Sequence, residues 1–294
     1  MDMEYWRWPE TTWAVKNANL KDGAAITAGV DVGTTSTQAA ILFGEKLIGY
    51  SSLHTGASFK KAANDAIEAA AAGTGVSIRD IADIGGTGFG KKNIDFATKR
   101  FDEVQCHAKG ARYMYGPDVR TVVDMGGQTI KAIRLFEWDR VRDFMINDKC
   151  ATGEGRNIEV LCDLMHIDIS EIGPKSLEVE KDPEPVSTTC WAFAATETLG
   201  LFGRAEYRSK KLSEAEIYAS YLFAVAWRIL GVVGKLAPLD TGDLQIDGGL
   251  ALTGGLAKNP GIAKRIEREL RIEAATSSYD PMLAGAIGAA LLVQ

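Results

Sequence analysis

Apolar residues in the first half of the chain form short continuous runs that are typical of buried β-strands. Ile26–Val32 is predicted to be such a strand, and after a tight glycine turn Ala39–Phe43 is predicted to return beside it. About ninety residues later the arrangement recurs, with Thr121–Met125, a second glycine turn and Ile130–Leu135. Because solenoid repeats have periods of roughly 20–50 residues, this wider spacing indicates a duplicated domain.

The rest of the chain alternates between helical and strand patterns. A capping box formed by Ser213 and Glu216 predicts the start of one helix. The predicted helices are Lys60–Ala72, one from about Ala108, Arg156–Met165, Phe193–Phe202, Ser213–Lys235, Pro260–Leu270 and Pro281–Val293. Further strands are predicted at Ile81–Ile84, ending in a turn at Gly85–Gly86, and at Gly249–Thr253, with an exposed loop at Leu177–Val186. Strands and helices that alternate in this way predict an α/β fold.

The two related halves predict a domain organisation. Residues 25–120 together with 281–294 are expected to form one domain, and residues 121–280 a second domain. Residues 1–24 are rich in tryptophan but have the period of neither a helix nor a strand. We expect them to be an arm that covers the body of the fold. A docking segment for another subunit is the alternative, because aromatic residues are enriched at protein interfaces.

Composition and charge exclude several classes of protein. The chain has 294 residues, of which 46% are hydrophobic, which is enough for one large domain or two ordinary ones. The net charge is −6 and no long basic run is present, so a nucleic-acid partner is not expected. Met282–Val293, the most apolar run, is too short to cross a bilayer, and the N-terminal residues do not resemble a signal peptide. We therefore expect a cytoplasmic protein without a membrane partner.

Two aspartates precede the glycine turns of the repeated hairpins at matching positions. Asp31 and Asp124 lie in buried strands, where a carboxylate is costly unless a metal ion or a donor compensates it. We expect both to be catalytic and to flank one Mg-nucleotide between the halves, as magnesium ligands directly or through water. Glycine turns also bring backbone N–H groups close to phosphates. The expected nucleotide-binding residues are Gly33, Thr34, Thr35 and Ser36 in the first turn, Gly126 and Gly127 in the second, and Gly254, Gly255 and Asn259 at a third turn.

Three further features bear on this nucleotide site. Gly85–Lys92 has the glycine and lysine spacing of a P-loop, but Lys92 stands where Ser or Thr must ligate magnesium, which argues against that motif. Gln128 is a catalytic candidate that could orient the attacking water, by analogy with glutamine in other nucleotide hydrolases, and a plain turn residue is the alternative. Lys131 is expected to face outward from its strand.

The four cysteines divide into two kinds. Cys150 and Cys190 each precede a predicted helix, whose free N–H groups and dipole favour a thiolate or an anionic cluster. Cys162 shares an apolar helical face and is expected to be a core thiol, whereas Cys106 has no partner at metal-ligand spacing. Two cysteines are half of the ligands of a [4Fe–4S] cluster, so a dimer partner would supply the rest. Two unrelated buried cysteines are the alternative that position alone leaves open.

The three glycine turns in this order resemble those of the actin, Hsp70 and sugar-kinase ATPase superfamily. The resemblance implies two ribonuclease-H-like domains with ATP in the cleft between them. It assigns the first turn to the β- and γ-phosphates and magnesium, the second turn to the phosphates, and the third turn to adenosine.

Four local motifs resemble one family within that superfamily, the BadF/BadG/BcrA/BcrD/HgdC ATPases. It comprises activators of 2-hydroxyacyl-CoA dehydratases and ATPase subunits of benzoyl-CoA reductase. The motifs are Asn-Asp-Lys-Cys-Ala-x-Gly-x-Gly-Arg at Cys150, Ser-Thr-Thr-Cys with Phe-Ala after it at Cys190, Asp-Met-Gly-Gly-Gln, and Gln-Cys-His-Ala ahead of that hairpin. The resemblance, over roughly Gly29–Leu292, implies that Cys150 and Cys190 bind a [4Fe–4S] cluster shared across a subunit interface. It also implies that ATP hydrolysis drives an electron from reduced ferredoxin to a partner subunit that performs the acyl-CoA chemistry.

Departures from the family pattern bear on the choice within it. The activators commonly have aspartate where this chain has Thr129, and the acidic pair common after Phe-Ala is reduced to Glu197, with Ala195 at the earlier place. These changes and the tryptophan-rich arm resemble the shorter, delta-type ATPase chain of benzoyl-CoA reductase, which pairs with a longer relative. The alternatives are a homodimeric dehydratase activator, a small-molecule kinase of the same fold, and a non-enzymatic nucleotide-dependent scaffold.

Overall fold

The computed structural model describes residues 7–16, 23–137, 140–147, 153–203, 212–236, 246 and 248–294. The chain divides into two compact units. The first unit consists of Pro9–Val122, Ile133–Asp143 and Ala275–Gln294, and the second unit consists of Met1–Trp8, Val123–Ala132 and Phe144–Ala274. The two hairpin aspartates therefore belong to different units, Asp31 to the first and Asp124 to the second.

Strands and helices alternate along the chain. The strands are β1 (Thr11–Ala14), β2 (Ile26–Val32), β3 (Ser36–Phe43), β4 (Lys46–His54), β5 (Asp83–Thr87), β6 (Lys99–Arg100), β7 (Val119–Met125), β8 (Ile130–Leu135), β9 (Val141–Ile146) and β10 (Gly249–Thr253). The helices are α1 (Phe59–Ala71), α2 (Glu103–Tyr115), α3 (Glu154–Met165), α4 (Ile169–Lys175), α5 (Trp191–Gly203), α6 (Glu214–Val233), α7 (Pro260–Leu270) and α8 (Ala284–Leu292). Strands β2, β8 and β10 and helix α7 have the predicted bounds.

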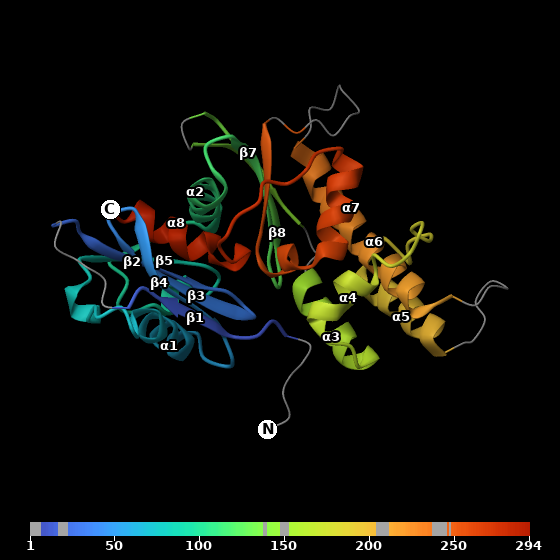
Figure 1. Ribbon diagram of the computed structural model, residues 1–294, viewed down its shortest axis with the longest axis horizontal. Helices are drawn as coiled ribbons and strands as arrows, with labels where there is room; N and C mark the ends of the chain where they lie inside the picture. The colour runs from blue at the N-terminus through green and yellow to red at the C-terminus, as the bar shows by residue number, and fades with distance from the viewer. Residues whose placement is uncertain are drawn as a thin grey trace. The chain divides into compact units, whose positions relative to one another are not determined.

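The first unit is built on a six-stranded sheet in the order β1-β4-β3-β2-β5-β6. β2 pairs antiparallel with β3, as predicted for the first hairpin, and parallel with β5. α1 packs against β3 and β4, whereas α8 packs against β2, β3 and β5 with α2 beside it, so that helices cover both faces of the sheet (Figure 1). This double cover explains why β2 and β3 are buried along nearly their whole length.

Glycines let α8 approach its neighbours at backbone distance. A Cβ atom on Gly29 of β2 would lie 1.9 Å from the carbonyl oxygen of Ala286 in α8. A Cβ atom on Gly110 of α2 would lie 1.9 Å from the carbonyl oxygen of Ala284. Both distances are far below van der Waals contact, so these two positions require glycine if α8 is to keep its place.

Gly110→Ala is expected to lower the free energy of unfolding by about 2–3 kcal/mol, because the added methyl group collides with a backbone oxygen. Gly231→Ala is the matched control, since Gly231 lies in helix α6 with nothing within 4 Å of its Cβ position. There the change is expected to stabilise the protein by up to about 1 kcal/mol through helix propensity. Urea unfolding measures both effects, and a Gly110→Ala protein as stable as the wild type would contradict this packing.

Three sequence predictions are wrong in the first unit. Thr11–Ala14, within the arm expected to lack regular structure, form edge strand β1, which pairs antiparallel with β4. Gly85 and Gly86 lie inside strand β5 rather than in a turn. The reason is again close packing, since a Cβ atom on Gly85 would lie 2.3 Å from the Ala289 oxygen of α8. Helix α2 begins at Glu103, five residues before its predicted start.

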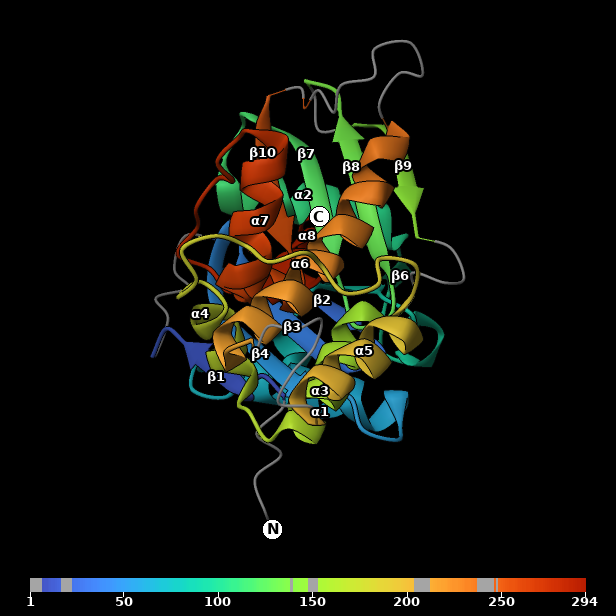
Figure 2. The same ribbon diagram turned by 90° about the vertical axis from the view of Figure 1, so that its right-hand side faces the viewer.

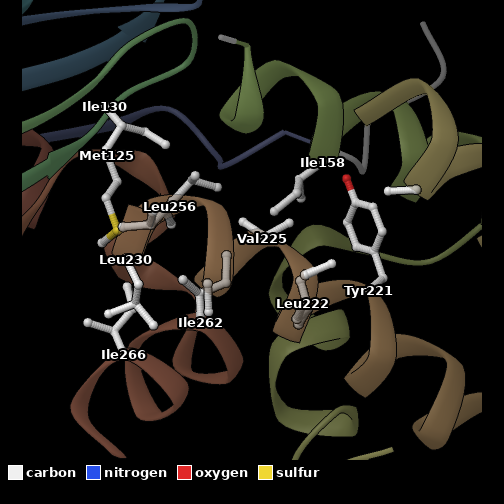
Figure 3. Packing of buried hydrophobic residues seen from close by; sticks show 14 of the residues in the cluster. Met125, Ile130, Ile158, Tyr221, Leu222, Val225, Leu230, Leu256, Ile262 and Ile266 are labelled. Carbon is white, nitrogen blue, oxygen red and sulfur yellow. The ribbon is translucent and has the colours of Figure 1, made fainter. Parts of the chain in front are cut away.

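The second unit holds its core around helices α6 and α7. It contains β10 and parts of β7, β8 and β9, which belong to a four-stranded sheet ordered β10-β7-β8-β9. Helices α6 and α7 pack side by side (Figure 2). Met125 and Ile130, which end β7 and begin β8, belong to the apolar cluster of this core. Figure 3 shows Met125 next to Leu256 and above Leu230 of α6. Packing of these two residues in the core thus fixes both ends of the turn between β7 and β8.

Helix α6 forms the centre of this core. Its predicted capping box is confirmed, because the Ser213 and Glu216 side chains each accept a hydrogen bond from the backbone N–H of the other. With the 3-10 turn that follows it, the segment Glu214–Leu236 is long and apolar enough to cross a membrane. However, 78% of its apolar window is buried within the protein, which is the pattern of a core helix.

Two arginines of α7 hold the segment that follows α4. Arg265 is 1% exposed and donates a hydrogen bond of 2.9 Å to the Ser176 carbonyl oxygen and another to the Asp182 carboxylate. Arg268 donates to the same carboxylate from a more exposed position. The buried guanidinium of Arg265 is therefore paired with a carboxylate, as a buried charge must be to be tolerated.

Candidate nucleotide site and cysteine segment

The two predicted hairpins share one turn geometry. In the first, the Gly33 N–H donates to the Ser36 carbonyl oxygen at 3.0 Å, and in the second the Gly126 N–H donates to the Thr129 oxygen at 3.0 Å. In each hairpin an aspartate precedes the turn glycine by two residues. The repeat read from the sequence is therefore a repeat of backbone hydrogen bonding and not of composition alone.

In the first unit, Asp31 lies in a confined pocket of polar and glycine residues. It is 7% exposed, and its Oδ2 lies 3.7 Å from Nε2 of His107 on α2. A Cβ atom on Gly88 would come within 2.3 Å of the Asp31 Oδ1, and one on Gly285, at the start of α8, within 1.9 Å of the Oδ2. The carboxylate thus points at the N-terminal end of a helix, where negative charge is favoured.

The first turn itself is braced from the residue that follows strand β4. The N–H of Thr55 donates to the Thr35 carbonyl oxygen at 3.0 Å, and the Thr55 hydroxyl donates to the Gly33 oxygen at 2.9 Å. Gly33, Thr34, Thr35 and Ser36 remain partly exposed. A pre-formed, partly exposed turn with small hydroxyl residues is suited to bind an oxyanion.

In the second unit, Asp124 pairs with a lysine that was expected to face outward. The Lys131 ammonium donates to the Asp124 Oδ2 at 3.0 Å and to the Thr129 hydroxyl at 2.9 Å, and Lys131 is only 4% exposed. The Thr253 hydroxyl donates to the other carboxylate oxygen at 3.4 Å. The outward-facing prediction for Lys131 is wrong because a buried carboxylate at 2% exposure needs a countercharge nearby.

The third glycine turn meets the second hairpin inside this unit. Gly254 has φ +84°, and a Cβ atom there would lie 2.5 Å from the Met125 oxygen and 2.9 Å from the Asp124 Oδ1. Trp8 covers the same turn, with the Lys258 ammonium 5.1 Å from its ring centroid and 3.7 Å between its ring and a Cβ atom on Gly255. The structure thus brings the second and third predicted turns together.

Asn259 has a structural role in addition to the one predicted for it. It is 1% exposed, and its side-chain oxygen accepts the Ile262 N–H at 3.2 Å as the N-cap of α7. The cap uses the side-chain oxygen, whereas the buried amide nitrogen has no hydrogen-bond partner in the described part of the chain, so the nucleotide role of Asn259 stays a prediction. Its place next to the third turn remains informative, because the cap fixes the angle at which α7 leaves that turn.

The second hairpin is bonded directly to the start of α3, a connection that sequence reasoning missed. The Gln128 carbonyl oxygen accepts the Gly153 N–H at 2.7 Å, and the Gly127 oxygen accepts the Arg156 N–H at 3.0 Å. A Cβ atom on Gly155 would lie 2.7 Å from the Gly126 oxygen. The Gln128 side chain is exposed, while its backbone ties the turn to a helix. The Gly-x-Gly spacing ahead of Arg156 was the available signal.

The cysteines separate by burial. Cys106 and Cys162 are fully buried, and burial raises the thiol pKa of each to about 12. The core role predicted for Cys162 is confirmed, and Cys106, which the sequence left undecided, is a core thiol as well. Cys190 is half-buried directly before α5, and its carbonyl oxygen accepts the Ala194 N–H at 3.1 Å. Cys150 lies outside the described residues.

A soft metal or a cluster requires a thiol with access to solvent or to a partner. Among the three cysteines that the structure describes, Cys190 alone meets this condition. Within the described ranges no group of three or more His, Cys, Asp and Glu side chains is arranged to hold a metal ion. The described residues therefore offer such a group one accessible cysteine as a ligand.

A buried ion pair joins the start of α3 to the segment that leads to Cys190. Glu154, 1% exposed, accepts hydrogen bonds from Arg228 of α6 at 2.6 and 3.0 Å. The same guanidinium donates to the Ser187 carbonyl oxygen at 3.1 Å. Burial raises the pKa of Glu154, and the bonds to Arg228 oppose that shift. The sequence contains no local sign of this pair, because its members are 74 positions apart.

The P-loop alternative is inconsistent with the geometry. Its first glycines lie within β5, and the following residues form only a 3-10 turn at Lys91–Asn93 rather than a helix. The Lys91 ammonium donates to the Phe101 carbonyl oxygen at 3.1 Å. A P-loop needs a helix N-terminus and a free lysine for phosphates, and this segment offers neither.

Comparison with known proteins agrees with this arrangement. The sequence of residues 28–293 matches the BadF/BadG/BcrA/BcrD ATPase family. The 2-hydroxyisocaproyl-CoA dehydratase activator of Clostridioides difficile is 30% identical over 266 residues, covering 90% of this chain and 93% of that protein. One of the subunits of benzoyl-CoA reductase from Thauera aromatica is 29% identical over 277 residues, covering 90% of this chain and 92% of that protein.

Solved structures show the same fold. The structure of the Clostridium difficile activator with bound ADPNP superposes with a TM-score of 0.79 over 91% of this chain and 94% of that one, at 30% identity. A glucokinase of the ROK family from Streptomyces griseus superposes with a TM-score of 0.52 at 13% identity, over 92% of this chain and 99% of that one, which shows the fold alone. The α/β class predicted from the sequence is thus confirmed, and the chain shares its fold with a sugar kinase.

Proposed function

The chain belongs to the BadF/BadG/BcrA/BcrD ATPase family, and from that premise we propose that it is an ATP-hydrolysing electron-transfer subunit. It would take electrons from reduced ferredoxin and pass them, through a [4Fe–4S] cluster shared with a second homologous chain, to an acyl-CoA enzyme. The observation that carries the proposal is Cys190: it is a half-buried thiol at the start of a helix, in the unit that also carries the Asp124 hairpin.

The nucleotide residues are assigned in the same proposal. The turns at Gly33–Ser36 and Gly126–Gly127 would contact phosphates through backbone N–H groups, and Gly254–Gly255 would lie against adenosine. Asp31 and Asp124 would carry the magnesium ion, directly or through water. With Lys131 bound to one Asp124 oxygen, a water-mediated contact is the simpler arrangement there. Gln128, whose side chain is exposed at the turn, would orient the attacking water.

Cys150 and Cys190 would be the two cluster ligands of this chain. A cluster bound there supplies one-electron transfer at low potential. The surface beside Cys190 supports a shared site, since Phe193 on the first turn of α5 is 62% exposed and Leu199 is 38% exposed on the same helix. Exposed apolar side chains next to an incomplete ligand set are expected where a second chain packs.

The final acceptor is proposed to be the catalytic part of a benzoyl-CoA reductase, with the protein acting in the cytoplasm. Support comes from the similarity to a component of that enzyme and from Thr129, which stands where the activators commonly have aspartate. A second candidate is the activation of a 2-hydroxyacyl-CoA dehydratase, which the 30% identity with such an activator favours equally. Reconstitution with ferredoxin, ATP and each class of catalytic subunit separates the two by which acyl-CoA is consumed.

Anaerobic purification tests the proposed function itself. The wild-type protein, alone or with its partner subunit, is expected to be coloured and to contain about four iron and four sulfide ions per pair of chains. It is also expected to hydrolyse ATP without any phosphate acceptor. A colourless protein that consumes ATP only when a small hydroxyl or acid substrate is added would instead be a kinase of the same fold.

A further inference from the structure

The second unit contains a continuous set of contacts from the Gly126–Thr129 hairpin to Cys190. Its first part is made by backbone groups: Gln128 and Gly127 accept hydrogen bonds from Gly153 and Arg156 at 2.7 and 3.0 Å. Gly155 permits this approach, because any Cβ atom there would overlap the Gly126–Gly127 backbone. A displacement of the hairpin by a bound phosphate must therefore displace the start of α3.

The second part is the ion pair between Glu154 and Arg228. Glu154 lies in the first turn of α3, between the two residues that bond to the hairpin. Both of its oxygens accept from one guanidinium, at 2.6 and 3.0 Å, and the two side chains are 0% and 3% exposed. Bidentate pairs of this kind fix orientation as well as distance. Because water is excluded, the pair cannot open without leaving a charge buried and unpaired.

The third part connects Arg228 to the cysteine segment. Its guanidinium also donates to the Ser187 carbonyl oxygen at 3.1 Å, three residues before Cys190. The Ser187 N–H donates to the Glu197 carboxylate of α5 at 2.8 Å, and the Cys190 oxygen accepts from Ala194 of the same helix. Ser187 is therefore held both by Arg228 and by the helix that follows Cys190.

We propose that Arg228 is a positioning residue that couples the nucleotide state of the Gly126–Thr129 hairpin to the position of Cys190. The inference rests on the proposed function for the identity of the group that Cys190 binds, but the coupling itself concerns this chain alone. Arg228 contacts α3 and the Ser187 segment with one rigid planar group, so a shift of one is transmitted to the other. Lysine has a single ammonium and cannot make the three contacts in the same geometry.

Arg228→Lys is the test variant, and Arg265→Lys is its matched control. Both arginines are buried in the same unit and pair with a carboxylate, but Arg265 holds the Asp182 segment through bonds to Ser176 and Asp182 rather than to α3 or Ser187. Both changes keep the charge and remove part of a buried hydrogen-bond network. A general loss of stability would therefore affect the two variants alike, whereas a loss of coupling would affect Arg228→Lys alone.

Two measurements report on Cys190. In cluster-bearing protein, the rate of iron release to a chelator is compared with ADP and with a non-hydrolysable ATP analogue. In protein stripped of iron, the rate of Cys190 alkylation, read by mass spectrometry, is compared under the same two conditions. In the wild type and in Arg265→Lys, we expect the ratio of each rate between the two nucleotides to be at least about fivefold. The ratio in Arg228→Lys should fall towards one while ATP hydrolysis continues.

The outcomes are distinguishable from those of the proposed function. Wild-type protein without iron would overturn the proposed function, and the alkylation measurement would still decide the coupling. An unchanged ratio in Arg228→Lys, an equal loss in Arg265→Lys, or no nucleotide dependence in the wild type would each overturn the coupling. If Arg228→Lys does not fold, the double variant Glu154→Gln/Arg228→Gln removes both charges together and leaves none unpaired, and it should lose the ratio in the same way.

Discussion

Asp124→Asn is expected to lower the rate of ATP hydrolysis at least about 100-fold, the magnitude seen when a preorganised electrostatic group is removed from a reaction centre. The carboxylate is held by Lys131 at 3.0 Å and by Thr253 at 3.4 Å, against the Gly254 turn. Asparagine keeps the shape and one acceptor oxygen but removes the charge that would hold magnesium. The loss of hydrolysis should therefore be seen at temperatures at which the variant is still folded.

The choice of asparagine follows from the buried lysine. Asp124→Ala would leave the Lys131 ammonium without its carboxylate, and breaking a buried pair in this way costs about 3–5 kcal/mol. A loss of activity in the alanine variant would then be indistinguishable from unfolding. In Asp124→Asn the Lys131 ammonium also loses its countercharge, but the amide oxygen can still accept its hydrogen bond, so we expect the melting temperature to fall by less than in the alanine variant.

Steady-state phosphate release and thermal unfolding of the same preparation make the measurement. Asp118→Asn is the matched control, because Asp118 is exposed immediately before the same strand β7. Its hydrolysis rate should equal that of the wild type. If Asp124→Asn hydrolysed ATP within a few-fold of the wild-type rate, neither magnesium binding nor catalysis could be assigned to Asp124.

Cys190→Ser is expected to abolish the bound iron and sulfide almost completely. The variant would remove a thiolate ligand of the cluster, and a serine hydroxyl, which stays protonated at neutral pH, does not replace it. Among the described cysteines no other thiol is accessible to solvent. Cys106→Ala and Cys162→Ala are the controls. Each removes a sulfur atom from a fully buried position and should leave the iron content unchanged, at the cost of a small cavity.

The same distinction predicts the pH dependence of thiol reactivity. Because burial raises the pKa of Cys106 and Cys162 to about 12, both thiols stay protonated between pH 7 and 9. Only above their raised pKa would the reactive thiolate form. The two core thiols should therefore react with iodoacetamide only after unfolding, whereas Cys190, which is only half-buried, should be alkylated in native, iron-free protein. In the iron measurement, iron that is retained in Cys190→Ser, or lost equally in Cys106→Ala and Cys162→Ala, would contradict the assignment of Cys190 as a cluster ligand.

Local patterns were sufficient for much of the fold. The ends of β2 and β10 follow from apolar runs that stop at Gly33 and Gly254, the start of α7 follows from Asn259 before a proline, and the capping box at Ser213 follows from two residues three positions apart. In each case the residues that determine the structure are neighbours in the chain. Helix α4, with Gly173 and Pro174 inside it, was not predicted because its residues have low helix propensity and tertiary packing stabilises it.

The candidate site divides in the same way. The sequence alone determined the paired Asp-Gly turns, the family and the separation of Cys190 from Cys162, because each depends on a short motif or a helical period. Only the tertiary structure decided that Lys131 is buried against Asp124 and that Arg228 joins Glu154 to the Ser187 segment. A charged side chain is stable in the interior only when its partner is present there. Arg228 and Glu154 are 74 positions apart in the chain, so no pattern of neighbouring residues could predict that they pair.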